Sequence, residues 1–204
     1  MHVSVLYSKI MSEIIGKNDR SVKSSSRTFF MSETMVTKKI NLGGGNDRMH
    51  GYINIDILAL PNVDIVHDLA TGIPLPDGSV EEVYTTHFLE HLSDVVFMMK
   101  EIYRVCAPGA LVKIKAPYFK SVGAFKDPTH KSFFTEKTFA YFNQGAVDHH
   151  ELPDYNLGVN FVTEKIAYVW AAPWLRYLPG KKIFWLKYFW NIARSIYYEL
   201  RVIK

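Results

Sequence analysis

The sequence of 204 residues contains only one cysteine, Cys106, and no long apolar run. A single cysteine cannot form a disulfide within the chain or supply a thiolate zinc site alone, so a reducing cytoplasm is the expected compartment. No uncharged apolar stretch approaches the roughly 20 residues that a membrane-spanning helix needs. Lys9, Ser12 and Glu13 interrupt the apolar residues near the start, so we expect no signal peptide.

A strong charge imbalance is also absent, because the net charge is only +4. No basic cluster indicates a nucleic-acid partner. The hydrophobic content of 48% is ordinary for a globular protein, and the length suits one domain. Residues 1–36 are polar, serine-rich and without a regular period, which predicts a flexible N-terminal extension. We expect residues 37–204 to form a single domain, and the sequence leaves its oligomeric state open.

The apolar pattern from Lys39 onward predicts strands that alternate with helices or tight crossovers, which is typical of an α/β parallel sheet. Helical spacing predicts a long helix over 92–106 and a short helix, capped by Thr135, over 135–142. The expected strands are 39–42, 51–57, 62–69, 80–88, 110–118, 160–170 and 195–204.

Three glycines, Gly43 to Gly45, follow the first expected strand, and Asp56 closes the second. Ligands of such sheets bind beyond the carboxyl ends of the strands, where a glycine turn lets backbone N–H groups approach closely. A plain tight turn is the alternative. A dinucleotide fingerprint would need glycine where Arg48 stands and an acid about 20 residues on. A ligand with a ribose and no pyrophosphate fits better.

Five motifs in order resemble the class I S-adenosylmethionine-dependent methyltransferases of the methyltransferase domain 11 type. They are "INLGGG", "INIDI", "VHDLATGIPLPDGSVEEVY", "HFLEHL" and "RVCAPGA", within Lys39 to Phe142. Two positions depart from the family pattern: Asn41 replaces a common acid, and Ala110 replaces a glycine. The resemblance implies a Rossmann-like, mostly parallel sheet with helices on both faces and an antiparallel last strand.

The resemblance also implies S-adenosyl-L-methionine as the cofactor. Glycines would line its methionine part, Asp56 would accept hydrogen bonds from its ribose, and Asp68 would bind its adenine amino group. Residues at the end of the fourth strand would flank the sulfonium and the acceptor. The implied cofactor-binding residues are Gly43, Gly45, Asp56, Asp68, Leu69 (through its backbone N–H), His87 and Phe88.

The segment "FKDPTHKSFFTEKTF" resembles a loop of relatives thought to act on sugars and cell-surface glycans. It follows the fifth strand, so Asp127 and His130 would lie at the active end of the sheet. His130 could remove a hydroxyl proton while Asp127 orients it, or both could fix a turn. Glu90 and His91 are interpreted as the start of the next helix rather than as catalytic groups.

No metal site is assigned. His149, His150, Glu151 and Asp154 form a cluster that could hold a metal or the acceptor, but without a recognised ligand spacing a solvated loop is favoured. The need for a metal therefore stays open.

Residues 172–194 are dense in aromatic residues and contain five cations without any acid, which predicts a basic aromatic insertion before the last strand. A helix starting at Lys181 would place Lys187, Asn191 and Arg194 on one face. The segment could be a core helix, a lid over the acceptor, or a peripheral membrane contact.

Together with the resemblance, these patterns predict a cytoplasmic S-adenosylmethionine-dependent methyltransferase, with a peripheral membrane contact through residues 172–194 as an open alternative. It would O-methylate a sugar, a glycan or a lipid-linked saccharide, a role in polysaccharide biosynthesis. The alternatives are methylation of a small-molecule natural product and a non-catalytic cofactor-binding partner protein.

Overall fold

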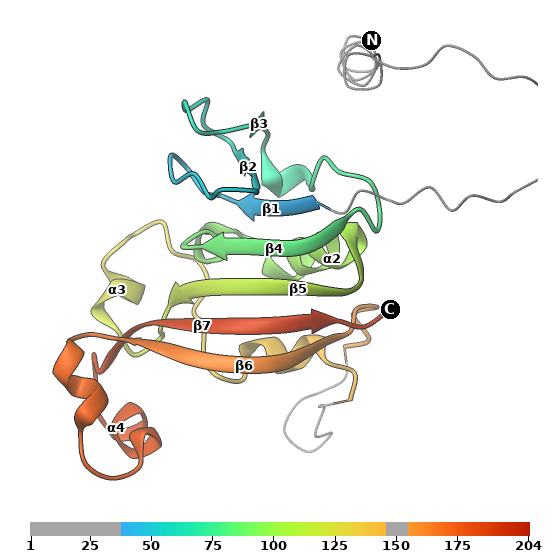
Figure 1. Cartoon of the computed structure of the whole chain (residues 1–204). Coiled ribbons are helices and arrows are strands. Elements are labelled where there is room, and N and C mark those ends of the chain that lie inside the picture. Colours follow the sequence, from blue (N-terminus) through green and yellow to red (C-terminus); the bar gives the residue numbers. More distant parts are fainter. Residues whose placement is uncertain (1–37, 146–154) are drawn as a thin grey trace, which may run out of the picture. The chain divides into compact units, whose positions relative to one another are not determined.

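The computed structural model describes residues 38–145 and 155–204, which form one seven-stranded mixed sheet (Figure 1). The strand order is β3-β2-β1-β4-β5-β7-β6. This sheet confirms the predicted Rossmann-like class, because β1 to β5 pair in parallel and β7 is antiparallel to both of its neighbours. The strands are β1 (Lys38–Leu42), β2 (Ile53–Asp56), β3 (Ile65–Val66), β4 (Val80–Thr86), β5 (Cys106–Pro117), β6 (Phe161–Trp170) and β7 (Ala193–Val202).

Short links join the first strands, and residues 43–52 pass from β1 to β2 without a helix. The 3-10 helices η1 (Leu69–Thr71) and η2 (Leu89–His91) follow β3 and β4. After η2 comes the helix α2 (Val95–Val105), which begins where the Asp94 side chain accepts a hydrogen bond from the backbone of Phe97. These links bring the carboxyl ends of β1, β2 and β4 to one edge of the sheet.

Apolar side chains on one sheet face form the core with α2, as the alternation in the strands requires. The buried α2 residues recur at helical spacing: Met98, Met99, Ile102 and Val105. Val83 in β4, Val112 in β5 and Leu200 in β7 are completely buried. The sheet therefore has a rigid centre, from which the loops at its edge project.

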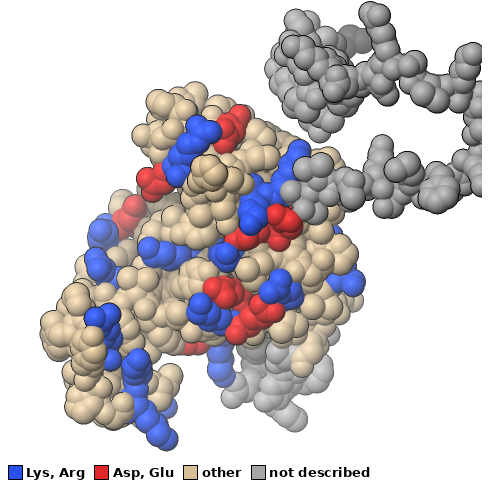
Figure 2. All heavy atoms as spheres, in the orientation of Figure 1, with Lys and Arg blue, Asp and Glu red and all other residues tan. Residues whose placement is uncertain are grey.

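The intervening strand residues carry charged and tyrosine side chains. Glu82 accepts hydrogen bonds from Tyr52 (2.5 Å) and Lys113 and forms an ion pair with Lys39 at 3.4 Å. Burial opposes ionisation of Glu82, yet the hydrogen bonds from Lys113 and Tyr52 hold its pKa below the usual value. Figure 2 shows Lys and Arg interspersed with Asp and Glu over the sheet.

Two predicted helices differ from the structure. The helix expected from Thr135 is the 3-10 helix η3 (Thr138–Phe142), because the Thr135 hydroxyl caps the N–H of Lys137 in a turn instead. The short helix α3 (Val122–Phe125) precedes it.

The helix considered from Lys181 to Arg194 is also wrong in extent. Residues 171–192 contain the 3-10 helix η4 (Pro173–Tyr177) and the helix α4 (Lys182–Tyr188). Asn191 then turns the chain with φ +57°, and Arg194 already belongs to β7. Among the described residues, no helix has the length and apolar content to cross a membrane.

Candidate functional site

The glycine turn after β1 is shaped by its neighbours. Gly43 has φ +64°, and a Cβ atom there would lie 2.4 Å from the Phe88 ring, so only glycine fits. Beneath the turn, Asn41 of β1 donates to Asn54 of β2 at 3.2 Å, and Asn54 donates to the carbonyl of Gly45 at 2.9 Å. A buried amide pair therefore fixes the turn to both strands. The departure at Asn41 from the family's usual acid thus has a structural role.

Asp56 connects the turn to the end of β2. Its Oδ2 atom accepts the Gly45 N–H at 2.8 Å, and its Oδ1 atom accepts the Leu58 N–H at 2.9 Å. Only 8% of the residue is exposed. Each carboxylate oxygen can accept a second hydrogen bond. Asp56 can therefore hold the loop and a pair of ribose hydroxyls together.

A cavity of about 310 Å³ lies above Gly43 and Asp56. Six of the seven predicted cofactor residues line it: Gly43, Asp56, Asp68, Leu69, His87 and Phe88. Gly45 does not line the cavity and acts through its bond to Asp56. A glycine backbone, a nearly buried carboxylate and a second, exposed carboxylate fit the methionine, ribose and adenine parts of S-adenosylmethionine.

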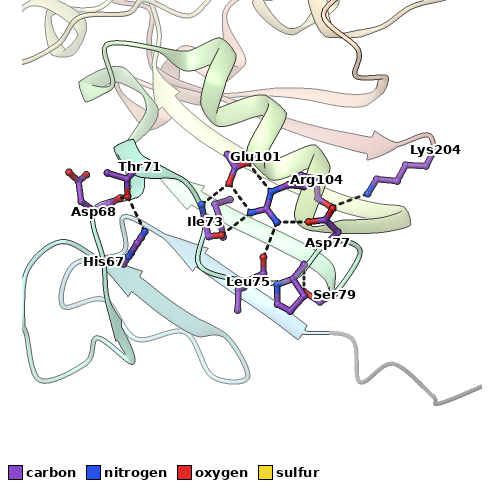
Figure 3. A network of polar contacts seen from close by, with 11 residues as sticks. His67, Asp68, Thr71, Ile73, Leu75, Asp77, Ser79, Glu101, Arg104 and Lys204 are labelled. Atoms are coloured by element: carbon purple, nitrogen blue, oxygen red, sulfur yellow. Dashed lines mark hydrogen bonds and ion pairs between the residues drawn. The ribbon is translucent and has the colours of Figure 1, made fainter. Parts of the chain in front are cut away.

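Asp68 begins η1, where its Oδ1 atom accepts the Ala70 N–H at 2.9 Å. Figure 3 shows that the adjoining loop is fastened by Arg104 of α2. The Arg104 guanidinium donates to Glu101 (2.8 Å), to Asp77 (2.6 Å) and to the carbonyl oxygens of Ile73 and Leu75. This clamp fixes the loop that carries Asp68 to the core helix. The sequence does not identify Arg104 as a clamp, because its partners in the loop lie 27 to 31 residues away.

His87 stands at the carboxyl end of β4 with φ +52°, a conformation uncommon outside glycine. Its backbone N–H donates to the Lys115 carbonyl at 2.9 Å, which holds it in this position. Its side chain lines the smaller cavity and also a second one of about 710 Å³. His91 lines both cavities too. His87, at the end of β4, therefore lies between the smaller and the larger cavity.

Asp127 and His130 both line the larger cavity. The His130 Nδ1 atom lies 2.9 Å from the Ala124 carbonyl, and its Nε2 atom lies 3.9 Å from Asp127 Oδ2, beyond hydrogen-bond range. The Asp127 carboxylate instead accepts the Thr129 N–H and hydroxyl, which hold its pKa below the usual value. The hydrogen-bond partner of His130 is therefore the Ala124 carbonyl, and an orienting role for Asp127 stays a prediction.

The sequence favours Glu90 and His91 as the start of the helix after the fourth strand, but they form the separate 3-10 helix η2, and α2 begins only at Val95. The structure adds that Glu90 is 1% exposed, lines the larger cavity and accepts a hydrogen bond from His87 Nδ1 at 3.1 Å. In the sequence, the only indication of this role is that Glu90 occurs in "HFLEHL", with one histidine three residues before it and another directly after it. The cluster of His149, His150, Glu151 and Asp154 lies outside the described residues.

Residues 45–114 match the family described as methyltransferase domain. A curated Mycolicibacterium smegmatis protein, described as "Probable S-adenosylmethionine-dependent methyltransferase", is 32% identical over 77 residues. That match covers 38% of this chain and 30% of the relative, so the chain spans less than a third of the relative's length.

Two solved structures show the same fold. An S-adenosylmethionine-dependent methyltransferase from Archaeoglobus fulgidus has a TM-score of 0.56 at 16% identity, over 81% of this chain and 86% of that chain. A Haloferax volcanii complex between the Trm112 methyltransferase activator and a proposed methyltransferase contains a similar chain. Its TM-score is 0.52 at 11% identity, over 83% of this chain and 84% of that chain.

The sheet order and the glycine turn beside a cavity are the arrangement expected of class I S-adenosylmethionine-dependent methyltransferases. The match of residues 45–114 to the methyltransferase domain and the likeness in fold to solved methyltransferases support the resemblance seen in the motifs. The cofactor of the family is S-adenosyl-L-methionine, and the residues around the smaller cavity suit it.

Proposed function

We propose that the chain transfers a methyl group from S-adenosylmethionine to a hydroxyl of a saccharide, a glycan or a lipid-linked saccharide. The observation that carries the proposal is that His87 and His91 line both the smaller cavity, which we call the cofactor cavity, and the larger one. A shared wall suits a reaction in which the nucleophile and the methyl carbon must be aligned. We refer to the larger space as the acceptor cavity.

When bound, S-adenosylmethionine supplies an electrophilic methyl group. Asp56 and Gly43 would hold the ribose and methionine parts, and Asp68 with the Leu69 N–H would hold the adenine. The protein must also take up the proton of the acceptor hydroxyl. His130 donates from Nδ1 to the Ala124 carbonyl, so its Nε2 atom carries a lone pair in the neutral ring. His130 is therefore the proposed general base.

The charges around the acceptor cavity support a polar, anionic acceptor. Lys115, Lys126 and Arg194 line it together with histidine and carboxylate side chains. Cations favour phosphate-bearing or carboxylate-bearing sugars. A lipid-linked saccharide bears phosphate in its linkage, and this favours it over a neutral natural product, which remains the first alternative.

The basic aromatic segment, residues 172–194, supports a membrane-borne acceptor. Trp174 is 64% exposed and Tyr177 is 72% exposed, and only Leu175, Leu186 and Ala193 are buried apolar residues there. A core helix is therefore the weaker interpretation. Figure 2 shows Lys and Arg without Asp or Glu over the α4 region of this face. Aromatic rings with cations favour an anionic membrane surface.

The decisive experiment incubates the full chain with methyl-labelled S-adenosylmethionine and a cell extract, followed by separation of lipid, glycan, protein and RNA. We expect label in the lipid or glycan fraction. Label elsewhere would contradict the acceptor class. No transfer despite cofactor binding would favour a non-catalytic partner protein, and the likeness in fold to a chain of the Trm112 complex is consistent with a protein partner.

A further inference from the structure

Two segments distant in sequence bring three metal-ligating side chains together. Glu90 and His91 lie in η2, and His130 lies in the loop after α3. The backbone N–H groups of Lys131 and Ser132 donate to the Glu90 carbonyl at 2.7 Å and 3.2 Å, which fixes the loop against η2. One ligand atom from each of the three side chains lies within 4.8 Å of those of the other two.

Hydrogen bonds set which nitrogen carries the proton in each neutral imidazole ring. His130 Nδ1 donates to the Ala124 carbonyl at 2.9 Å. The Thr129 hydroxyl donates to Asp127 at 2.7 Å and must therefore accept from His91 Nδ1 at 2.8 Å. Each neutral ring thus keeps its lone pair on Nε2. Outer contacts of this kind, from histidine Nδ1 to a carbonyl or to a hydroxyl–carboxylate pair, orient metal-binding histidines.

Glu90 points independently to a cation. Its Oε1 atom accepts from His87, but its buried Oε2 atom has no hydrogen-bond donor among residues 38–145 and 155–204. A buried carboxylate oxygen without a partner is costly, because it has lost its water without replacement. All three side chains line the acceptor cavity, so an ion between them would keep coordination positions open to that cavity.

We propose that Glu90, His91 and His130 bind one divalent transition-metal ion. Two imidazoles and one carboxylate suit Zn²⁺, Fe²⁺, Mn²⁺ or Co²⁺, whereas Mg²⁺ and Ca²⁺ prefer oxygen ligands. Bond lengths of about 2.0–2.2 Å mean that donors on opposite sides of an ion lie about 4.4 Å apart. Small side-chain rotations therefore close the three atoms onto one ion.

The ion would bind the acceptor hydroxyl, and this part rests on the proposed function. A divalent cation lowers the pKa of a coordinated oxygen, so the hydroxyl proton passes to solvent in the open cavity. His130 is then a metal ligand, and the ion takes over the task assigned to it as a base. The site thus selects acceptors that present a coordinating oxygen.

Equilibrium dialysis of the full chain against Zn²⁺, and Co²⁺ titration followed by visible absorption, test the site. We expect one tightly bound ion per chain. Glu90→Gln should weaken binding at least about 10-fold. Thr129→Val, which removes the hydroxyl that accepts from His91 Nδ1 and donates to Asp127, should weaken it about 10- to 100-fold. His50→Ala, an exposed histidine in the β1–β2 link, is the control and should bind as the parent does.

No bound ion in the parent chain, or unchanged binding in folded Thr129→Val, would overturn the site. So would loss of the ion in a His149→Ala/His150→Ala double variant with Glu90 intact. Calorimetry with S-adenosylmethionine and the labelled methyl-transfer assay separate the two proposals. Transfer that survives removal of the ion by a chelator overturns the metal role and leaves the proposed function standing. Ion binding in a chain that transfers no methyl group overturns the proposed function and leaves the site standing.

Discussion

The Nδ1 atom of His130 donates to the carbonyl oxygen of Ala124 at 2.9 Å, so the lone pair of the neutral ring is on Nε2 and is available to accept a proton or to bind a metal. His130→Ala should therefore lower turnover about 10²- to 10⁴-fold while S-adenosylmethionine affinity stays nearly unchanged. Without the Nε2 atom, the acceptor hydroxyl loses its proposed proton acceptor. Steady-state kinetics test this, with His50→Ala as control. Full turnover of His130→Ala would make the residue structural.

Asp56 accepts backbone N–H groups on both oxygens and lines the cofactor cavity. Asp56→Ala should weaken S-adenosylmethionine binding by about 1.5–3 kcal/mol, and Asp56→Asn by less, because the amide keeps one acceptor. Calorimetry measures both. Asp64→Ala is the matched control: Asp64 also accepts a backbone N–H, from Asn54 at 2.8 Å, but does not line that cavity. Equal losses in the Asp56 and Asp64 variants would refute the ribose assignment.

Arg104 should influence how the free energy of unfolding changes as the pH falls. Its hydrogen bond to Glu101 holds the pKa of that carboxyl below the ordinary 4.5. This contribution is complete above the ordinary pKa and is lost as the pH falls through the folded value. Arg104→Lys should cost about 1.5–3 kcal/mol at neutral pH and flatten the fall in stability on acidification. Urea unfolding from pH 7 to pH 3 tests this, and Arg201→Lys, at a more exposed ion pair, should change stability less.

Cys106 offers a probe of global unfolding. Burial at the start of β5 raises the pKa of its thiol to about 12, and the residue is completely buried. Because the thiolate is the reactive form, iodoacetamide should not label the native chain at pH 8 and should label it rapidly in urea. Mass spectrometry follows the reaction. Rapid labelling of native protein would show that the β5 end of the sheet opens locally.

The basic aromatic segment should bind anionic membranes. Each Lys or Arg near such a surface contributes about 1 kcal/mol, and the exposed rings favour the headgroup region. Co-sedimentation with phosphatidylserine vesicles should weaken with salt and should be lost when Lys181, Lys182 and Lys187 are all changed to Glu. Single Lys187→Glu and Lys100→Glu variants form a matched pair, since Lys100 is exposed on α2. No binding at low salt would favour a soluble acceptor beneath an aromatic lid.

The strands and the cofactor cavity were predictable because their signals are local. β-Branched runs indicate β1, β2 and β4, and the glycines and Asp56 occur at strand ends, where the topology of the sheet brings them together. The extent of α4 was not predictable, because the helix ends where the chain must return to the sheet. That return depends on the pairing of Trp170 with Ala193 across the hairpin.

The Glu90 cluster was missed for a related reason. Glu90 lies near an expected helix start in the sequence, and an acidic residue at such a position is usually exposed to solvent. Its burial depends on the loop that follows α3, through contacts of Lys131 and Ser132 with the Glu90 carbonyl. Contacts between segments that far apart carry no signal in local spacing, so only the folded chain shows them.

Trp170 and Ala193 are register partners, so residues 171–192 leave the β6–β7 hairpin and return to it at the same place. Such an excursion can change in length without shifting the register of the two strands, provided that the core contact of Leu186 and the hydrogen bond from Asn191 to the Lys120 carbonyl are kept. Doubling the length of a flexible loop costs only about 0.6 kcal/mol. The domain can therefore accept a transplanted segment from a related chain. Because Ala171 and Asn191 line the larger cavity, exchanging residues 171–192 would alter the proposed acceptor cavity without changing the residues that line the smaller one.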